Sequence, residues 1–342
     1  MGSPLGLTRQ QLSAVFPRWV PSGANASATT MYVVKLCYAL RRGVFYPSAR
    51  DEFGEMPPRA ERRRYLPLVK SMGFSAVEVP ADESVDERSA RDLALELEDA
   101  GLAIGAVRGG GALAHPLSGE RARQRLERAI RYAGWTGASI VNTAMVSPAT
   151  HPNGPGSGRQ GEQVSQGSSR LASEQDFLAT AQHLRNAGQL AADLNVKISI
   201  EVHQGSIADN ATATLHLLDL VGMESVGANP DLGNIYWQYE HPEETAEAAI
   251  VALAPRAAYW HCKNLRRLHL PELNRSFFTR VPLPDGDIDY RFAIGAMLDA
   301  DYQGYLAIEG AREGDQLSLD RRGVEYVQTL LAEAATPQLS AV

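Results

Sequence analysis

From Val33 onward, short apolar runs of the chain alternate with longer segments that have helical periodicity. Eight such runs occur, and they begin at Val33, Ser75, Ala103, Ser139, Val196, Val226, Ala257 and Tyr305. They are rich in Val, Ile and Ala with little polar alternation, which is typical of parallel strands buried on both faces. Strands that alternate with helices form βαβ units. The pattern therefore predicts an α/β protein with an eight-stranded parallel sheet and eight helices.

Two architectures accommodate eight such units, an open doubly wound sheet and a closed barrel. A doubly wound sheet that binds a dinucleotide carries a glycine-rich turn of fixed spacing after an early strand, and the GGGA at Gly109 lacks that spacing. We therefore expect a single (β/α)8 TIM barrel over residues 32–335. Residues 1–31 are expected to form a disordered leader, and residues 336–342 a C-terminal tail.

Two long segments interrupt the alternation. Residues Val146 to Ser173 are rich in Gly, Ser and Pro, and residues Asn264 to Asp285 follow the seventh apolar run. Both connect a strand to the next helix, so a barrel places both on its catalytic face. We expect the first to be a disordered flap and the second, which contains Phe277 and Phe278, to be more ordered.

Composition and charge exclude several classes of protein. The net charge of -7 argues against a nucleic-acid partner or an anionic membrane surface, which need basic patches. Only Cys37 and Cys262 occur, which excludes a disulfide framework and fits a reducing compartment. No apolar run reaches the roughly 20 residues that span a bilayer. We therefore expect a cytoplasmic protein with no membrane and no nucleic-acid partner.

Four of the last apolar runs end at polar side chains that would be costly to bury alone, Glu201, Asp231, His261 and Glu309. Any one of them could be a salt-bridged or capping residue at a strand end. Consecutive barrel strands bring their ends to one rim, however, and three carboxylates close together repel unless a cation lies among them. The set predicts a site for one divalent metal ion, with Mn2+ the most suitable and Mg2+, Co2+ or Zn2+ also possible.

Several segments of the sequence resemble those of a known family. The segments IEVH at Ile200, NPDLGN at Asn229, WHCKN at Trp260, DGDIDY at Asp285 and YQGYLAIEG at Tyr302 resemble the xylose-isomerase-like barrel superfamily. That superfamily contains sugar isomerases, ketose epimerases and abasic-site endonucleases. The resemblance implies that Glu201, Asp231, His261 and Glu309 ligate the metal and that the two Glu residues form an acid–base pair. It also implies that Arg267 lies near substrate oxygens.

One position departs from the family pattern. Many epimerase-type members have Asp-x-x-His, whereas this chain has Asp231-Leu-Gly-Asn234. Asn can hydrogen-bond a substrate hydroxyl, but it cannot ligate a metal well or shuttle a proton. The departure weakens an assignment as an ordinary ketose epimerase, and it also weakens the endonuclease alternative, which needs additional His and Asp ligands.

A metal held by these residues predicts proton abstraction next to a carbonyl, through an enediolate or enolate, and the resemblance implies that the substrate is a sugar or keto-sugar. Glu201 and Glu309 would move protons, and Lys263 would add positive charge near the enolate. The candidate substrate-binding residues are His203, Asn234, Arg267, Trp237 and His151. Reprotonation would give an isomerase or epimerase, and loss of a leaving group would give a lyase.

Two alternatives remain open. The resemblance extends to the larger subunit of C-glycoside deglycosidases, which cleave 3-keto C-glycosides by elimination. The second alternative is a non-catalytic barrel that binds a metal and a sugar. By resemblance we also expect a homo-oligomer, or a hetero-oligomer with a small companion subunit, that acts on a small sugar, keto-sugar or glycoside.

Overall fold

The computed structural model describes residues 34–39, 58–81, 85–146, 169–237, 243–273, 275–310 and 314–335. The expected leader at 1–31, the C-terminal tail at 336–342 and most of the expected flap lie outside the described residues. Among the described helices, none has both the length and the apolar character needed to cross a lipid bilayer.

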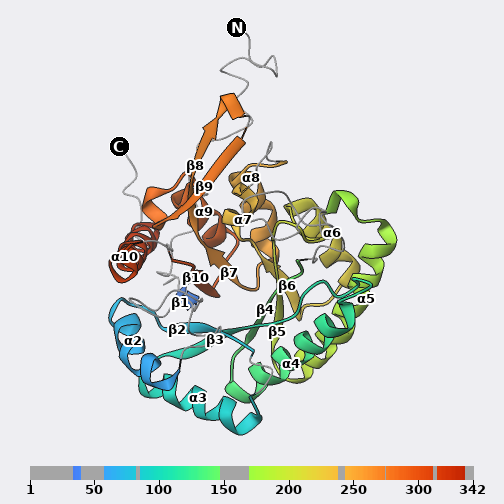
Figure 1. The fold of residues 1–342 in the computed structure, drawn as a ribbon, viewed down its shortest axis with the longest axis horizontal. Helices are drawn as coiled ribbons and strands as arrows, with labels where there is room; N and C mark the ends of the chain where they lie inside the picture. The colour runs from blue at the N-terminus through green and yellow to red at the C-terminus, as the bar shows by residue number, and fades with distance from the viewer. Residues whose placement is uncertain are drawn as a thin grey trace, which may run out of the picture.

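The apolar runs form an eight-stranded parallel sheet that curls into a nearly closed barrel (Figure 1), which confirms the predicted fold class. The strands follow the order β6-β5-β4-β3-β2-β1-β10-β7. Their bounds are β1 Lys35–Ala39, β2 Ala76–Pro80, β3 Ala103–Arg108, β4 Ile140–Ala144, β5 Lys197–Glu201, β6 Val226–Asn229, β7 Trp260–Cys262 and β10 Tyr305–Ile308. Between β6 and β7 the described ladder is reduced to an isolated parallel bridge, Ala228 to Ala257.

A ring of helices surrounds the barrel (Figure 1). They are α2 Arg59–Ser71, α3 Glu87–Asp99, α4 Gly119–Thr136, α5 Glu174–Asp193, α6 Ala211–Val221, α7 Leu232–Tyr236, α8 Ala246–Leu253, α9 Tyr290–Asp299 and α10 Gln316–Ala335. Several begin where a side chain accepts a hydrogen bond from a backbone amide of the first turn. Ser173, for example, caps α5 in a capping box with Asp176.

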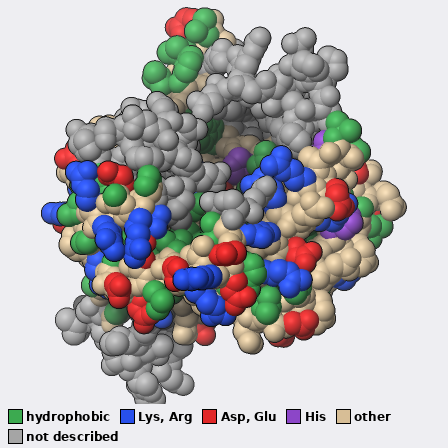
Figure 2. Space-filling view, turned by 60° about the horizontal axis from the view of Figure 1, so that its bottom comes forward, with side chains coloured by type: hydrophobic (Ala, Val, Ile, Leu, Met, Phe, Trp, Pro, Cys, Tyr) green, Lys and Arg blue, Asp and Glu red, His purple; other side chains and the backbone are tan. Residues whose placement is uncertain are grey.

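The outer faces of these helices carry charges of both signs, which are interspersed on the face shown in Figure 2. Pairs one helical turn apart account for part of the pattern, such as Arg91 with Glu87 on α3 and Arg131 with Glu127 on α4. Such exposed pairs stabilise a helix only slightly. Because acidic and basic side chains are interspersed, the described part of this face has no broad basic patch.

The barrel interior is filled in layers, because alternate residues of a strand point to the same side. One layer holds mostly small or apolar side chains, Cys37, Ala76, Ala106, Ile140, Tyr259 and Ala307. Two residues further along their strands come Glu78, Asn142, His261 and Glu309, all buried. The barrel therefore changes from apolar to polar toward the carboxyl ends of its strands.

The segment after β7 is a β-hairpin that projects from the barrel (Figure 1). Strands β8 (Asn264–Leu270) and β9 (Arg275–Val281) pair antiparallel in a sheet of their own. The sequence predicted an ordered loop here and missed the two strands. Leu268 and Phe277 on the hairpin are 61% and 46% exposed.

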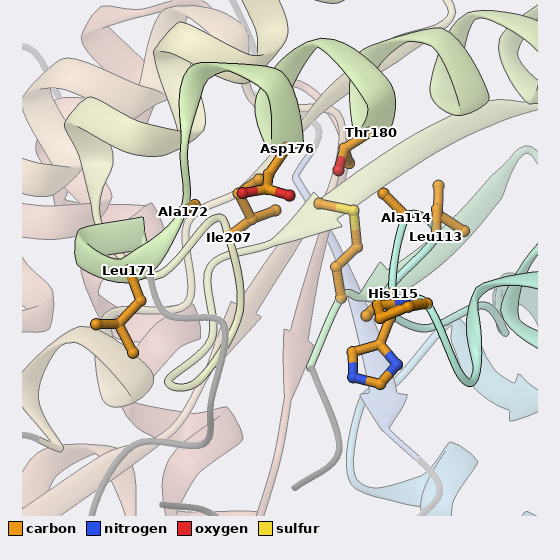
Figure 3. Close-up of a pocket in the computed structure, with 11 residues that line it drawn as sticks. Leu113, Ala114, His115, Leu171, Ala172, Asp176, Thr180 and Ile207 are labelled. Carbon is orange, nitrogen blue, oxygen red and sulfur yellow. The ribbon is translucent and has the colours of Figure 1, made fainter. Parts of the chain in front are cut away.

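A cavity of about 300 Å³ lies beside the carboxyl ends of β3, β4 and β5 (Figure 3). Its lining is largely apolar and includes Leu113, Met145 and Ile207, with His115 and Thr180 among the polar side chains. His115 Nδ1 faces the amide of Ser118 at 3.2 Å. Met145 follows Ala144, which is the register partner of Glu201, so the cavity adjoins the rim that carries the predicted metal ligands.

Candidate metal centre

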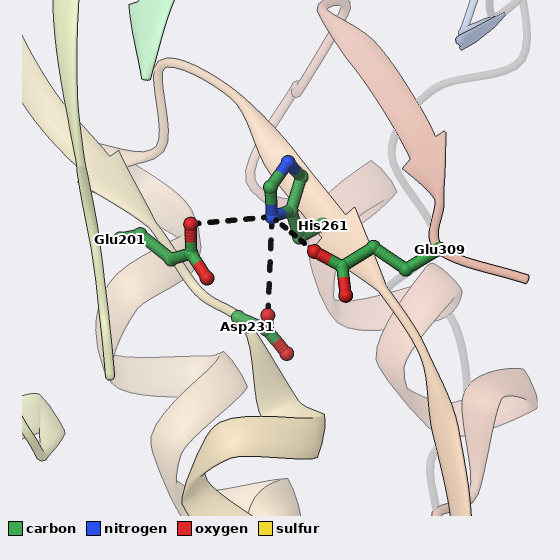
Figure 4. A group of neighbouring side chains, drawn as sticks. All are labelled: Glu201, Asp231, His261 and Glu309. Carbon is green, nitrogen blue, oxygen red and sulfur yellow. Dashed lines mark ion pairs between the residues drawn. The ribbon is translucent and has the colours of Figure 1, made fainter. Parts of the chain in front are cut away.

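The four predicted ligands converge at the carboxyl ends of neighbouring strands (Figure 4). Glu201 is the last residue of β5, and Asp231 follows β6 and caps α7. His261 lies in the middle of β7, and Glu309 directly follows β10. One ligand atom from each lies within 4.8 Å of the others, and all four residues are buried.

The imidazole Nδ1 of His261 is the central atom of this group. It lies 3.1 Å from Glu309 Oε1, 3.4 Å from Glu201 Oε2 and 3.9 Å from Asp231 Oδ2. Among the described residues this buried nitrogen has no hydrogen-bond partner. A buried nitrogen that faces three carboxylate oxygens is the donor set expected around one divalent cation. The residues therefore fit a metal ion.

The charged groups of the centre lie close enough to shift one another's pKa. Burial lowers the pKa of His261, but the carboxylates of Glu78 and Glu201 raise it more, to well above its ordinary value. Burial raises the pKa of Glu201, yet the charges of His261, His203 and Lys263 bring it well below the usual range. Burial also raises the pKa of Asp231 despite the neighbouring ammonium of Lys263. Each charged group of the centre thus changes the protonation of its neighbours.

Lys263 and Arg280 supply part of the compensating positive charge. Lys263 Nζ lies 2.6 Å from Asp231 Oδ2 and 3.4 Å from Glu309 Oε2. Arg280 reaches in from the hairpin, and its Nη1 lies 3.0 Å from Glu309 Oε2. Lys263 was predicted from the sequence. Arg280 was not, because only the pairing of β9 with β8 brings it back to the rim.

Two buried asparagines, Asn142 and Asn229, hold the ligands in place. Asn142 Nδ2 donates to Glu201 Oε2 at 2.9 Å, and Asn229 Nδ2 donates to Asn142 Oδ1 at 3.0 Å. Asn229 Oδ1 accepts from the backbone amide of His261 at 2.7 Å. These side chains fix the orientation of a carboxylate and of a strand.

Asn234, which stands where a His was expected, lies inside the ligand group. Its Nδ2 is 3.0 Å from Glu201 Oε1, 3.0 Å from Asp231 Oδ2 and 2.9 Å from the Val202 carbonyl. An amide nitrogen has only two hydrogens, so these three acceptors occupy its donor capacity. The structure places Asn234 as a brace between two ligands, and its contact with substrate stays a prediction.

The other predicted substrate-binding residues differ in their burial and contacts. His203 is half-buried just after β5, its Nδ1 donates to the Gln204 carbonyl at 2.8 Å, and its charge acts on Glu201. The ring of Trp237 lies 6.1 Å from that of Phe278 on the hairpin. Arg267 is exposed, and its Nε donates to Ser276 Oγ at 2.9 Å across the hairpin. His151 lies outside the described residues.

Glu78 is a site residue that the sequence analysis missed. It lies in β2, is fully buried, and its Oε2 is 2.5 Å from His261 Nε2. A signal was present, because a charged residue inside the apolar run SAVEVP is costly to bury without a partner.

Comparison with known proteins agrees with the fold. A family model described as a xylose isomerase-like TIM barrel matches residues 66–330. Inosose dehydratases from two strains of Clostridium perfringens are 25% identical over 152 residues, which is 42% of this chain and 50% of theirs. The chain thus matches about half the length of these curated relatives.

Solved structures share the fold. A xylose isomerase-like TIM barrel protein from Mycobacterium smegmatis in complex with magnesium is 19% identical, with a TM-score of 0.72 over 91% of this chain and 100% of that one. An L-ribulose 3-epimerase is 16% identical, with a TM-score of 0.66 over 90% of this chain and 100% of that one. Since the family model spans residues 66–330, well over half of the sequence, the chain belongs to the xylose isomerase-like TIM barrel family.

Proposed function

We propose that this protein is a divalent-metal-dependent enzyme that removes a proton from the carbon next to a carbonyl of a sugar or keto-sugar. The observation that carries the proposal is the arrangement around His261 Nδ1, where three carboxylates meet a nitrogen that has no hydrogen-bond partner among the described residues. Glu201, Asp231, His261 and Glu309 would hold the ion. Bound there, a divalent ion would polarise a substrate carbonyl and stabilise the negative charge that develops on its oxygen.

In this proposal Glu201 and Glu309 would move the protons. They approach the centre from opposite sides of His261 (Figure 4). A sugar carbon held between them would face one carboxylate on each side, so one can remove a proton and the other can return it. This arrangement supports isomerase or epimerase chemistry.

Lys263 and Arg280 would stabilise the reacting substrate. Both cations contact Glu309, and Lys263 is only 2% exposed. In a site so well shielded from water, a fixed positive charge stabilises a developing oxyanion more strongly than it would in solution. His203, Asn234, Arg267, Trp237 and His151 remain the candidates for contact with the rest of the substrate.

Elimination is the second candidate reaction. The curated relatives are named inosose dehydratases, and loss of water begins with the same proton abstraction next to a carbonyl. Cleavage of a 3-keto C-glycoside would be the same elimination with a carbon leaving group. The outcome depends on whether the substrate carries a leaving group on the carbon beyond the one that loses its proton.

The test is metal-dependent exchange of substrate hydrogen with solvent deuterium. Chelator-treated protein would be reloaded with Mn2+, Mg2+, Co2+ or Zn2+ and incubated in D2O with a ketose, a keto-inositol and a 3-keto-glycoside, and the products analysed by NMR. We expect deuterium next to the carbonyl of at least one compound in the metal-loaded wild type. Glu309→Gln should abolish the exchange.

The matched control is Glu96→Gln, which removes a carboxylate that is paired with Arg62 between α2 and α3, away from the centre. It should exchange like the wild type. Metal binding without exchange in any of the compounds would favour a non-catalytic barrel and refute the proposed activity.

A further inference from the structure

Glu78 is a buried charge that the proposed reaction does not use. It is the middle residue of β2, and its side chain is 0% exposed. A carboxylate out of contact with water is costly to bury unless good partners compensate its charge. Its partners therefore indicate why this position tolerates a charge.

The two oxygens of Glu78 have different partners. Oε2 lies 2.5 Å from His261 Nε2, and Oε1 lies 3.2 Å from Arg108 Nε. Arg108 comes from the adjacent strand β3, whereas His261 comes from β7, which is separated from β2 by β1 and β10 in the sheet order. The contact with His261 thus crosses the interior of the barrel.

This geometry determines which imidazole nitrogen can bind a metal. A carboxylate can only accept a hydrogen bond, so His261 donates its Nε2 hydrogen to Glu78. A ligating imidazole is neutral, so once the ring has lost its second proton the lone pair is on Nδ1, the atom that faces Glu201, Asp231 and Glu309. A histidine that ligates a metal usually donates its other N–H to a carboxylate or carbonyl, which fixes the ring orientation.

We propose that Glu78, held by Arg108, is the positioning residue that orients the His261 ring and leaves Nδ1 as its metal-binding atom. The inference rests on the metal centre of the proposed function and assigns its support to two residues outside the ligand set. Glu78 acts only through His261 and touches no substrate. A purely structural role would affect unfolding without changing metal affinity.

The first experiment measures metal affinity without using activity. Mn2+ would be titrated into metal-free wild type, Glu78→Gln and the control Glu96→Gln, with free Mn2+ followed by electron paramagnetic resonance. Gln keeps the size of Glu78 but loses the charge that aligns the imidazole N–H. We expect Glu78→Gln to bind Mn2+ about 10- to 100-fold more weakly than the wild type, as is typical for outer-shell partners of a ligating histidine.

The control separates this effect from a general loss of stability. Glu96 is also a largely buried carboxylate paired with arginine, and its side chain is 8% exposed. Glu96→Gln should keep wild-type Mn2+ affinity even if its thermal unfolding midpoint falls. Equal Mn2+ affinity of Glu78→Gln and the wild type would overturn the inference while leaving the proposed function intact.

The second experiment needs no variant, so it holds even if Glu78→Gln does not fold. Wild type with 15N-labelled histidine would be titrated with Zn2+ and followed by long-range 1H–15N correlation NMR. We expect the His261 Nδ1 signal to move on metal binding while Nε2 keeps its proton. Metallation of Nε2 would overturn the inference, and a wild type that binds neither Mn2+ nor Zn2+ would refute the proposed function with it.

Discussion

At the scale of single residues, the position of Lys263 depends on the missing side chain of Gly233. A Cβ built on Gly233 would lie 2.3 Å from Lys263 Cγ and 2.9 Å from its Cε. The stem of the lysine therefore passes against the backbone of α7 on its way to Asp231. No other amino acid at position 233 leaves that path open.

We expect Gly233→Ala to displace the Lys263 ammonium and slow proton abstraction by roughly 100-fold, the cost of a catalytic group misplaced by about 1 Å. The measurement is the rate of solvent-deuterium exchange in metal-loaded protein. Gly134→Ala is the control, since its nearest contact, Leu194 Cδ1, lies at 3.4 Å. An unchanged rate in Gly233→Ala would show that the reaction does not need Lys263 in this position.

Only some residues of the metal centre could be predicted from the sequence. The sequence allowed four ligands to be selected, because each ends an apolar run and the ends of barrel strands meet at one rim. They are Glu201, Asp231, His261 and Glu309. Glu78 sits inside its run, and only the curvature of the closed barrel brings it to His261 on a strand that is not its neighbour. Asn142 and Asn229 also lie inside apolar runs, and they were missed because an uncharged amide is a weaker signal than a buried carboxylate.

At the scale of elements, the β8–β9 hairpin contributes to the centre through Arg280. The sequence alone does not distinguish Arg280, which turns toward the centre, from Arg266 and Arg267, which are exposed on the same hairpin. The strands themselves were missed because the segment lacks a regular alternation of polar and apolar residues, and its pairing is anchored instead by Asn264 and Asp287 at the base.

We expect Arg280→Gln to bind Mn2+ more tightly and to exchange substrate hydrogen more slowly. The guanidinium of this largely buried pair competes with the metal for Glu309, so its loss should raise the Mn2+ affinity about tenfold, which corresponds to about 1.4 kcal/mol. Mn2+ titration and deuterium exchange measure the two effects. Arg266→Gln, which removes an exposed partner of Asp287, should change neither. Weaker metal binding in Arg280→Gln would contradict this assignment.

Helix α10 is tied to β1 by a buried hydrogen bond from Tyr38 to Asp320 Oδ2, 2.9 Å long. Burial raises the pKa of Asp320 to about 7, although the bond from Tyr38 lowers it. The folded state therefore prefers the protonated acid. The raised pKa of Asp320 therefore adds to the stability of the folded protein. This contribution is fully present below the ordinary pKa of 3.8 and is lost as the pH rises through about 7.

Asp320→Asn removes this dependence, because the amide keeps a hydrogen-bond acceptor for Tyr38 and has no charge to bury. We expect the variant to be more stable than the wild type at pH 8, with the advantage shrinking toward pH 5. Denaturant unfolding at both pH values measures it. An advantage that is equal at the two pH values would show that Asp320 does not titrate in this range.

At the scale of the whole molecule, the order of the strands could largely be predicted from the sequence, because successive strands of a (β/α)8 barrel lie side by side. The sequence did not predict how completely the barrel closes. Asp231 and His261 lie on either side of the join between β6 and β7, where the ladder is reduced to the bridge at Ala228. The amide of His261 donates there to the side chain of Asn229 in place of a backbone carbonyl.

A cation that binds Asp231 and His261 together would link the two margins of the barrel, so the same ion that serves the chemistry would also act as a cross-link. We expect metal loading to slow hydrogen–deuterium exchange of amides in β6 and β7 more than in β2 and β3, measured by mass spectrometry. Uniform slowing would contradict this local effect. We therefore expect removal of a bound ion to open the cylinder along this seam before the remainder unfolds.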